Sequence, residues 1–490
     1  MKYYIGVDLG TSSCKMILSD ENNLILNTVT KSYLVNYPNL GWSEQNPKDW
    51  WDAFKNGVKE LVLNINPKDV KAIGVAGQMH SLVILDEEDK VIRPAILWND
   101  GRTFKETEYL NNVIGKEKLS KLTANIAFAG FTAPKLLWLK NNEPNNFNRI
   151  KKIMLPKDYL NYCLTGVHSC DYSDASGMLL LDVKNKKWSK EMLEICGIKE
   201  EQMPNLFESY EPIGKVLPSV AKELGFSEDT VVSAGASDNA GAAIGTKTIG
   251  DGKCNISLGT SGTIFISSET FKVDEYNSLH SFCHADGNYN LMGCILSAAS
   301  CNEWFCDSVL ENKNYTMLQE NVSDELLGKN NVYFLPYLMG ERSPINDTNA
   351  SGTFIGLRPT TTSKEMLLAV FEGVSFAIRD NLEIVKKLGL DIPVCTVSGG
   401  GAKSKLWMKI LSNVLNVELV IPETEEGPSL GAVYLAKQAA FDLENLTQQI
   451  DLKIKETIKP NVELVELYEQ KYNKYKKIYP ALKQVFKELN

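Results

Sequence analysis

Apolar positions fall into two kinds of run along the first half of this chain. A longer run from Pro47 to Leu63 has the three- and four-residue spacing of an amphipathic helix, and Asn46 before Pro47 is a typical helix start. Short apolar runs typical of strands occur at Tyr3–Val7, Lys15–Leu18, Leu24–Val29, Ala72–Val75 and Leu82–Leu85. Strands that alternate with helical segments predict an α/β fold.

The second half repeats this plan. Strand-like runs are predicted at Lys253–Ser257, Thr263–Ser267, Tyr289–Cys294 and Val394–Ser398, and helices at 363–388 and from Ser404 onward. The last stretch, Glu463–Leu489, has apolar and aromatic residues three or four apart, which predicts helices that pack against the body of the protein. Pro480 predicts a kink or a break between two helices there.

A short phrase occurs twice, about half a chain apart. Residues 5–13 read Ile-Gly-Val-Asp-Leu-Gly-Thr-Ser-Ser, and residues 255–262 read Asn-Ile-Ser-Leu-Gly-Thr-Ser-Gly. Each copy lies between two apolar runs, so each predicts a tight β-hairpin whose glycine lets a ligand approach the backbone. For one copy, an ordinary turn is an equal alternative, but two aligned copies favour two related halves.

The turns of both hairpins are candidate phosphate sites, because hydroxyl groups and turn amides bind anions. The candidate residues are Thr11, Ser12, Gly259 and Thr260. Asp8 in the first copy corresponds to Ser257 in the second, so a carboxylate suited to a metal ion is present in one half alone.

Length and composition fit two ordinary globular domains. The chain has 490 residues, of which 43% are hydrophobic and 23% charged, and the repeat places the predicted boundary at residue 245, giving domains 1–245 and 246–490. The net charge of −9, without a basic face, argues against nucleic acid as a partner. No apolar stretch is long enough to span a membrane, and the N-terminus does not resemble an export signal. Scattered cysteines suit a reducing compartment, so we expect a cytoplasmic protein.

A small-residue segment with a single carboxylate lies just before the second hairpin. Residues 232–245 read as a strand, a turn and a helix, with Asp238 and Asn239 at the turn. A carboxylate at a helix start is often merely an N-cap. Here the small neighbours leave space for a substrate, so Asp238 is a candidate to face both a sugar hydroxyl and a transferred phosphate.

Glycines cluster where two other helices begin. Residues 398–404 read Ser-Gly-Gly-Gly-Ala-Lys-Ser between a strand and a helix, so that Gly400 and Gly401 are candidates for close backbone contact with a nucleotide. The spacing is not that of a Walker A loop. A second glycine-bearing turn at Glu426–Ala432 is interpreted as its partner.

Polar residues also end two strands of the first half. Gln78, Met79 and His80 follow one strand, and Asn99 and Asp100 follow another. Such groups suit a polyhydroxylated ligand, although a single histidine at a strand end is equally often structural. The residues by themselves therefore indicate a two-domain protein that holds a nucleotide and a small polar molecule.

Taken together, these motifs resemble the FGGY carbohydrate kinases. Two longer segments match the family signatures, Gly130–Asn142 and a stretch from Gly352 to Gly373. The resemblance covers nearly the whole chain and implies two actin-like ATPase domains, of the ribonuclease H-like type, around a central cleft. Segments such as Trp42–Pro47, Gly77–His80, Ala95–Arg102 and Asp171–Gly177 are most similar to the branch of the family that phosphorylates D-xylulose.

The resemblance also implies roles for individual residues. Met79 and His80 would contact the sugar, together with Asp100 and Asn239. Asp238 would be the general base, and Asp8 would serve the phosphate and its Mg²⁺, so that Asp8 and Asp238 are the expected metal ligands. The N-terminal domain would bind the sugar and the C-terminal domain the ATP.

The sequence departs from the family pattern at two places, of which the second bears on substrate choice and the first adds little bulk. Ala236 and Ser237 replace glycines before Asp238, and Ser81 replaces a glycine after His80. A kinase for ribulose, glycerol or another polyol is therefore the nearest alternative, and an actin-like nucleotide-binding protein without catalysis is a more distant one. A homodimer is a further expectation.

Overall fold

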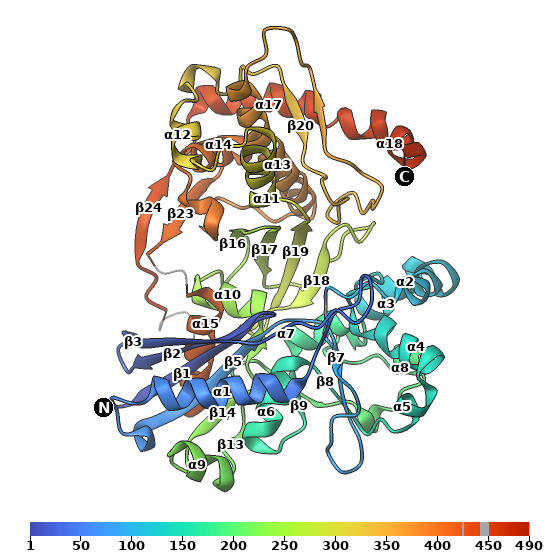
Figure 1. Ribbon diagram of the computed structural model, residues 1–490, viewed down its shortest axis with the longest axis vertical. Helices are drawn as coiled ribbons and strands as arrows, with labels where there is room; N and C mark the ends of the chain where they lie inside the picture. Colours follow the sequence, from blue (N-terminus) through green and yellow to red (C-terminus); the bar gives the residue numbers. More distant parts are fainter. Residues whose placement is uncertain (424–425, 442–449, 490) are drawn as a thin grey trace. The chain divides into compact units, whose positions relative to one another are not determined.

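The computed structural model describes residues 1–423, 426–441 and 450–489. Its elements form two seven-stranded sheets, each with helices packed around it (Figure 1). The first sheet has the order β13-β14-β5-β1-β2-β3, with β15 paired to β5, and the second has the order β18-β19-β17-β16-β22-β23-β24. The α/β class predicted from the sequence is confirmed.

The first sheet is built around the predicted hairpin. Its strands are β1 (Tyr3–Leu9), β2 (Ser13–Asp20), β3 (Ile25–Ser32), β5 (Val70–Gly77), β13 (Pro212–Lys215), β14 (Val231–Ser233) and β15 (Ala236–Ser237). β1 pairs antiparallel with β2, with Leu9 opposite Cys14, and parallel with β5. β14 and β15 also run parallel to β5, so β1, β5 and β15 end at the same edge of the sheet.

The second sheet repeats this arrangement. Its strands are β16 (Cys254–Leu258), β17 (Gly262–Ser268), β18 (His280–Cys283), β19 (Tyr289–Ile295), β22 (Val394–Ser398), β23 (Glu418–Pro422) and β24 (Ile454–Ile458). β16 pairs antiparallel with β17, with Leu258 opposite Gly262, and parallel with β22. Both copies of the repeated phrase therefore form hairpins, and the first strand of each hairpin also pairs in parallel with another strand of its sheet.

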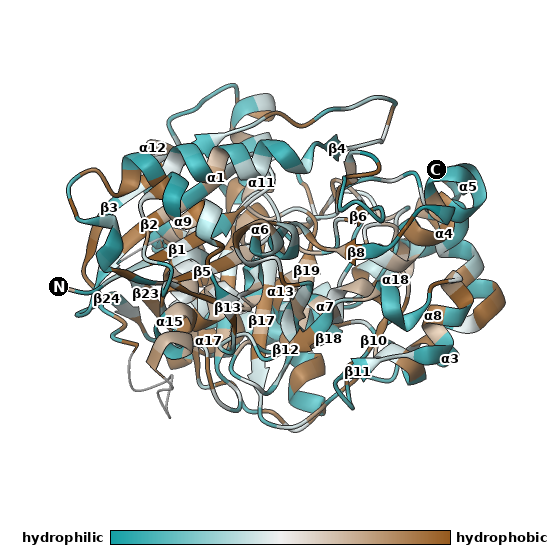
Figure 2. Cartoon of the chain, turned by 90° about the horizontal axis from the view of Figure 1, so that it is seen from below, coloured by the Kyte–Doolittle hydropathy of each residue, from teal (hydrophilic) through white to brown (hydrophobic). Residues whose placement is uncertain are grey.

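Helices of the first half cover its sheet and build an additional lobe. They are α1 (Pro47–Leu61), α2 (Phe104–Glu108), α3 (Lys116–Thr123), α4 (Thr132–Asn142), α5 (Pro144–Asn148), α6 (Pro156–Thr165), α7 (Tyr172–Ala175), α8 (Lys190–Cys196), α9 (Pro218–Leu224) and α10 (Asp238–Gly245). Asn46 caps α1 as predicted, because its side chain accepts a hydrogen bond from the Lys48 amide. Figure 2 shows hydrophilic residues along much of α1, whose opposite face buries Trp50, Phe54 and Leu61.

Short two-stranded sheets are formed by segments that lie before and between these helices in the sequence. They are β4 (Glu44–Gln45) with β7 (Ala95–Ile96), β6 (Val83–Leu85) with β8 (Lys152–Met154), β9 (Ser169–Asp171) with β12 (Asn205–Phe207), and β10 (Leu181–Asp182) with β11 (Lys187–Trp188). In the second half, β20 (Tyr333–Leu335) pairs with β21 (Thr353–Ile355).

The helices of the second half are α11 (Ala299–Trp304), α12 (Tyr315–Glu320), α13 (Ser363–Lys387), α14 (Lys405–Leu415), α15 (Gly427–Phe441), α17 (Val462–Tyr475) and α18 (Ile478–Leu489). The predicted break in the C-terminal helical segment lies before Ile478, so Pro480 stands in the first turn of α18 rather than at the break. A proline is tolerated there because the first amides of a helix have no acceptor within it. Tyr468, Tyr472 and Tyr475 are buried, which confirms the packing face of α17.

The chain divides into two compact units, each built from three separate stretches of the sequence. Unit 1 comprises residues 1–249, 281–290 and 426–452, and unit 2 comprises 250–280, 291–425 and 453–490. Each unit has its own hydrophobic core, one around Ile5, Val75 and Trp50 and one around Ile256, Val397 and Phe371. No helix in the described part of the chain has the length and apolar character needed to cross a membrane.

Helix α15 belongs to unit 1, although it follows strands of unit 2 in the sequence. It packs on β1, β5 and α10, and Figure 1 shows this red helix beside the blue strands β1 and β2. That the Glu426–Ala432 turn is the partner of the glycine loop at 398–404 stays a prediction, since the turn belongs to unit 1 and the loop to unit 2. Glycines of this helix serve a close backbone approach within unit 1, since a Cβ on Gly431 would lie 1.9 Å from the Gly241 carbonyl oxygen.

Candidate functional site

Asp8 and Asp238 lie at the same edge of the unit 1 sheet, on either side of β5. Asp8 is level with Ala76 in the β1–β5 pair, and Ala236 of β15 is level with the same residue. Two residues later, Asp238 begins α10. Because adjacent strands are about 4.8 Å apart, the backbones of β1 and β15 are about 10 Å apart at this level. The structure thus brings together the two carboxylates that the sequence singled out.

Both carboxyl groups have pKa values that are raised toward neutrality. Burial raises the pKa of Asp8 to about 7, with the Asp238 charge adding to the effect and the Lys15 ammonium opposing it. Burial also raises the pKa of Asp238 to about 6, while hydrogen bonds from Asn239 oppose the shift. A carboxylate with such a pKa is well matched to accept a proton near neutral pH.

The local structure at Asp238 rules out the N-cap alternative. Ser237 is the N-cap of α10, and its side chain accepts from the Ala240 amide. The Asp238 Oδ1 atom accepts instead from the backbone amide of Asn239 at 2.7 Å and from its side-chain Nδ2 at 2.9 Å. Asn239 therefore holds the carboxylate in one orientation at the sheet edge.

Met79 and His80 directly follow β5 at this edge. The Asn239 Nδ2 atom lies 4.0 Å from the Met79 sulfur, so the candidate residues of two separate segments are neighbours. His80 is mostly buried, and its Nδ1 atom lies 2.7 Å from the Gly177 carbonyl oxygen. Three of the four predicted sugar-side residues, Met79, His80 and Asn239, thus form one cluster with Asp238.

The turn of the first hairpin has its carbonyl groups occupied. Tyr33 donates to the Gly10 carbonyl at 2.6 Å, and the Gln45 side-chain amide donates to the Thr11 carbonyl at 2.7 Å. The backbone amides of Thr11 and Ser12 have no acceptor within the described residues. Fixed carbonyls and available amides are the arrangement that binds an anion.

The turn of the second hairpin shows the same feature in unit 2. The Ala298 amide and the Ser300 hydroxyl donate to the Thr260 carbonyl at 2.9 and 2.8 Å, and the Ala299 amide donates to the Gly259 carbonyl at 2.9 Å. The Thr260 amide finds no acceptor in the part of the chain that is described. The prediction that the two halves share a phosphate-binding plan agrees with this local geometry.

The glycine loop at 398–404 contains glycines with different constraints. Gly399 has a φ of +85°, and a Cβ on Gly401 would lie 2.7 Å from the Trp407 ring and 2.8 Å from the Leu258 side chain. A Cβ on Gly400 would meet no atom within 4 Å. Gly399 and Gly401 are therefore required by the fold of unit 2, whereas the fold itself does not require a glycine at position 400.

Asp100 is placed differently from the other candidates. Its two carboxylate oxygens accept four hydrogen bonds, from the Ser43 amide and from the Arg102 amide, Nε and Nη2 atoms. Four bonds use the acceptor capacity of a carboxylate. Direct contact between Asp100 and a sugar stays a prediction that this geometry does not support.

Ser81 is the other residue with a bearing on substrate choice. Its side chain is fully buried, and its hydroxyl oxygen accepts from the Trp98 amide at 3.0 Å. Trp98 in turn donates from its indole Nε1 to the Thr11 hydroxyl at 2.9 Å. Ser81 thus connects the sugar-side segment with the first hairpin.

The structure contains a buried charged network close to Asp238 that the sequence analysis did not predict. The Lys157 ammonium lies 2.6 Å from Asp158 and 3.1 Å from Asp171, and all three side chains are almost completely buried. Asp171 accepts from the Ser173 hydroxyl, which accepts from the Ser237 amide at 3.0 Å. Burial alone would lower the pKa of Lys157, but the surrounding carboxylates raise it well above its usual range. The signal was a Lys-Asp pair within an otherwise apolar segment.

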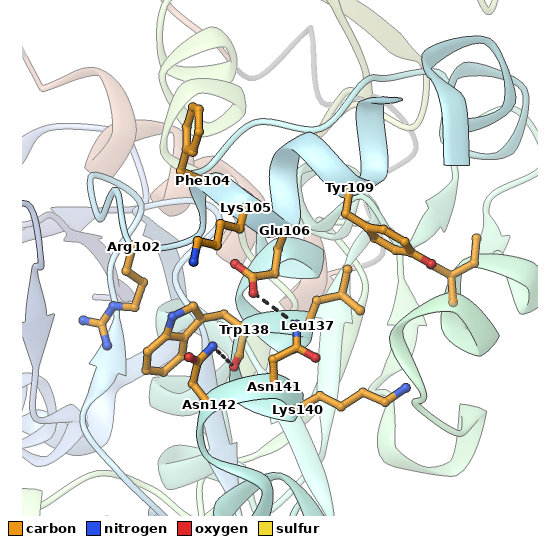
Figure 3. A pocket seen from close by; sticks show the side chains of 11 residues that line it. Arg102, Phe104, Lys105, Glu106, Tyr109, Leu137, Trp138, Lys140, Asn141 and Asn142 are labelled. Carbon is orange, nitrogen blue, oxygen red and sulfur yellow. Dashed lines mark hydrogen bonds between the residues drawn. The ribbon is translucent and has the colours of Figure 1, made fainter. Parts of the chain in front are cut away.

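A cavity of about 710 Å³ lies elsewhere in unit 1, between α2, α4 and α8. Figure 3 shows Glu106 bonded to Asn141 at its centre, and none of the predicted site residues lines it. No group of three His, Cys, Asp or Glu side chains within the described ranges forms a metal cluster.

Two related sheets, each with a hairpin turn whose amides are available to an anion, and a pair of carboxylates at one sheet edge suit phosphoryl transfer. Residues 3–245 match the N-terminal domain of the FGGY family of carbohydrate kinases, and residues 254–440 match its C-terminal domain. This chain belongs to that family.

Individual relatives cover almost the whole chain. The xylulose kinase of Escherichia coli K12 is 39% identical over 98% of this chain and 99% of its own length, and that of Bacillus subtilis 168 is 36% identical over 99% and 98%. Among solved structures, a xylulose kinase from Brucella ovis superposes with a TM-score of 0.94 at 38% identity, covering 99% of this chain and 100% of its own. A gluconate kinase from Lactobacillus acidophilus has a TM-score of 0.95 at 29% identity over 100% of both chains.

Proposed function

We propose that this protein transfers the γ-phosphoryl group of ATP to D-xylulose and so produces D-xylulose 5-phosphate. The observation that carries the proposal is the cluster of Asp238, Asn239, Met79 and His80 at one edge of the unit 1 sheet. Relatives named xylulose kinases, aligned over nearly the full chain, support the choice of sugar.

Asp238 is the general base in this proposal. The C5 hydroxyl of the sugar attacks the γ-phosphorus, the bond to the ADP oxygen breaks, and the Asp238 carboxylate accepts the hydroxyl proton. Its raised pKa and its hydrogen bonds from Asn239 support the assignment, because the carboxylate is oriented and a moderately strong base. Met79, His80 and Asn239 would orient the sugar, and Asp100 would act by fixing Arg102 and Ser43.

Asp8 and Asp238 suit Mg²⁺. Burial and, to a smaller extent, the nearby Asp238 charge raise the pKa of Asp8, and a divalent cation bound between the two carboxylates would relieve their repulsion. Mg²⁺ usually takes one or two carboxylates together with phosphate oxygens and water, so the absence of a larger acidic cluster among the described residues is compatible with it. When bound, the ion would neutralise charge on the transferring phosphate.

The nucleotide-side residues are assigned within unit 2. Thr260 and Gly259 would contact phosphate through the second hairpin, and Gly400 and Gly401 would line the nucleotide. Thr11 and Ser12 of unit 1 would supply further donors to phosphate. We keep the domains 1–245 and 246–490 as sugar side and nucleotide side, with helix α15 (Gly427–Phe441) lying within unit 1 by its contacts.

Gly400→Val tests the nucleotide assignment. We expect the KM for ATP to rise by roughly tenfold or more, because a side chain there would occupy the space of the ligand. The melting temperature without ligand should change by less than about 2 °C, since a Cβ at position 400 meets open space.

Gly401→Val is the matched control, because its side chain collides with Trp407 and Leu258. It should lower the melting temperature whether or not ATP is present. Steady-state kinetics with varied ATP and thermal unfolding of both variants check this pair. An unchanged KM for ATP in a folded Gly400→Val variant would contradict the assignment.

A coupled assay of ADP release tests the function. We expect kcat/KM for D-xylulose to exceed that for L-ribulose, D-ribulose, glycerol and gluconate by roughly tenfold or more. Gluconate belongs in the panel because a gluconate kinase has the same fold as this chain and is 29% identical to it in sequence. A higher value for another compound would change the substrate and keep the kinase, whereas ATP turnover that no sugar stimulates would contradict both.

Location and assembly remain part of the proposal. A cytoplasmic location follows from the use of ATP as co-substrate. Sedimentation would decide whether the protein is the expected homodimer, and neither membrane nor nucleic acid is needed for the reaction.

A further inference from the structure

Lys135 is a fully buried lysine that forms no ion pair within the described residues, although the Asp100 charge acts on it. It lies in α4, and its side chain has 0% exposure. No Asp or Glu of the described chain forms an ion pair with its ammonium group, which instead donates to two backbone carbonyls, that of His80 at 2.9 Å and that of Gly130. Burying a charge without an ion-pair partner costs folding free energy. The two carbonyl groups that accept from this ammonium are therefore the place to look for a role beyond packing.

The principal acceptor belongs to a residue with an unusual backbone. His80 has a φ of +67°, in the left-handed region that few residues other than glycine adopt. Its carbonyl oxygen accepts from the Lys135 ammonium and also from the Thr132 hydroxyl at 3.0 Å. Both donors come from α4 and are three residues apart, so they lie on one face of that helix.

The imidazole of His80 is fixed from the other side. Its Nδ1 atom lies 2.7 Å from the Gly177 carbonyl oxygen, and its ring centroid lies 4.5 Å from that of Phe131. A Cβ on Gly177 would lie 2.5 Å from Nδ1, so the ring has little freedom to move. The backbone hydrogen bonds and the ring contacts together determine the position of the His80 imidazole.

We propose that Lys135 is a positioning residue of the sugar subsite, which holds the His80 carbonyl so that the imidazole meets the sugar. The inference rests on the proposed function, because it takes His80 to be a sugar contact. Desolvation lowers the pKa of Lys135 well below its usual range, yet the ammonium retains two carbonyl acceptors in place of water. Its contacts therefore suit a role that acts through His80 rather than on the substrate.

Lys135→Met removes the donor and keeps an unbranched side chain of similar length. We expect the KM for D-xylulose to rise by roughly 10- to 100-fold, the range for losing a hydrogen bond from a charged donor. The KM for ATP and the slow ATP hydrolysis without sugar should stay within about twofold, because neither involves His80. Thr132→Val, which removes the neutral donor, should raise the sugar KM by a smaller factor of roughly 3 to 10. This second variant keeps the test decisive if Lys135→Met fails to fold.

Lys140→Met is the matched control on the same helix. Lys140 is exposed and lies on the face of α4 that lines the cavity in Figure 3, away from His80. Its sugar KM should equal that of the unaltered protein. Equal increases in the KM for sugar and ATP in the Lys135→Met or Thr132→Val variant would overturn the proposal in favour of a general structural role.

A double-mutant cycle with His80→Asn separates action through His80 from other effects. Asparagine tolerates a positive φ, so this variant removes the imidazole and keeps the backbone. If Lys135 acts through His80, adding Lys135→Met to His80→Asn should change the sugar KM by less than about twofold. Independent, multiplicative effects would overturn the proposal.

A crystal structure of the Lys135→Met variant distinguishes this inference from the proposed function. We expect the His80 peptide to leave its positive φ, whatever the substrate is. Retention of the present His80 conformation would overturn the positioning role even if D-xylulose is confirmed as substrate. Failure of the unaltered protein to phosphorylate D-xylulose would overturn the proposed function without affecting this structural readout.

Discussion

Asp238→Asn should lower kcat for sugar phosphorylation by about 10² to 10⁴, which corresponds to a barrier increase of about 3–5 kcal/mol. The asparagine Oδ1 can still accept the two hydrogen bonds that Asn239 donates at 2.7 and 2.9 Å. The variant therefore keeps the local geometry and removes the ability to accept a proton. The KM for sugar should change much less than kcat, because the loss concerns the transition state.

Steady-state kinetics at saturating Mg-ATP measure this effect, and Asp238→Ala should show a loss in the same range. Asp49→Asn is the control, since Asp49 is an exposed carboxylate in the first turn of α1 and should leave kcat unchanged. Activity above about a tenth of the original in the Asp238→Asn or Asp238→Ala variant would show that another group accepts the proton.

Gly431→Ala should destabilise unit 1 by about 3 kcal/mol or more, the upper range for overpacking a well-packed interior. The added Cβ would lie 1.9 Å from the Gly241 carbonyl oxygen and 2.7 Å from its carbonyl carbon. Both atoms belong to the backbone of α10, so relief requires the two helices to separate. Since α10 carries Asp238, the separation should also reduce activity at temperatures where the variant is still folded.

Gly427→Ala is the matched control in the same helix. Its Cβ would lie 3.4 Å from the nearest atom, in ordinary contact with Ala242. Thermal unfolding should show a much lower melting temperature for Gly431→Ala than for Gly427→Ala, which should resemble the unaltered protein. Equal melting temperatures for the two variants would contradict the account of how α15 packs.

The features that the sequence predicts well are local ones. Each repeated phrase combines a strand, a turn glycine and a second strand within a few residues, so the hairpins at Leu9–Cys14 and Leu258–Gly262 follow from short-range pattern alone. The strand, turn and helix around Asp238 follow in the same way. Asp8 and Asp238 could be expected at one sheet edge because Asp8 lies near the end of one parallel strand and Asp238 directly follows another.

The remaining features depend on contacts between distant segments. Whether Asp238 or Ser237 caps α10 depends on small differences in backbone angle. One of the four hydrogen-bond donors to Asp100 is the amide of Ser43, which is far away in the sequence. Helix α15 approaches the rest of unit 1 closely where Gly6 faces Ser429, Gly74 faces Ala432 and Gly431 faces Gly241. Lys135 and Lys157 look like surface residues in the sequence, because only the folded chain shows the carbonyl and carboxylate groups that surround them.

A crystal structure of the Asp238→Asn variant with D-xylulose, Mg²⁺ and a nonhydrolysable ATP analogue tests the central claim most directly. We predict that the C5 hydroxyl of the sugar lies within about 3.2 Å of the residue 238 side chain, with Met79 and His80 against the sugar. A sugar bound away from this sheet edge, or bound there with a different hydroxyl facing residue 238, would contradict the account.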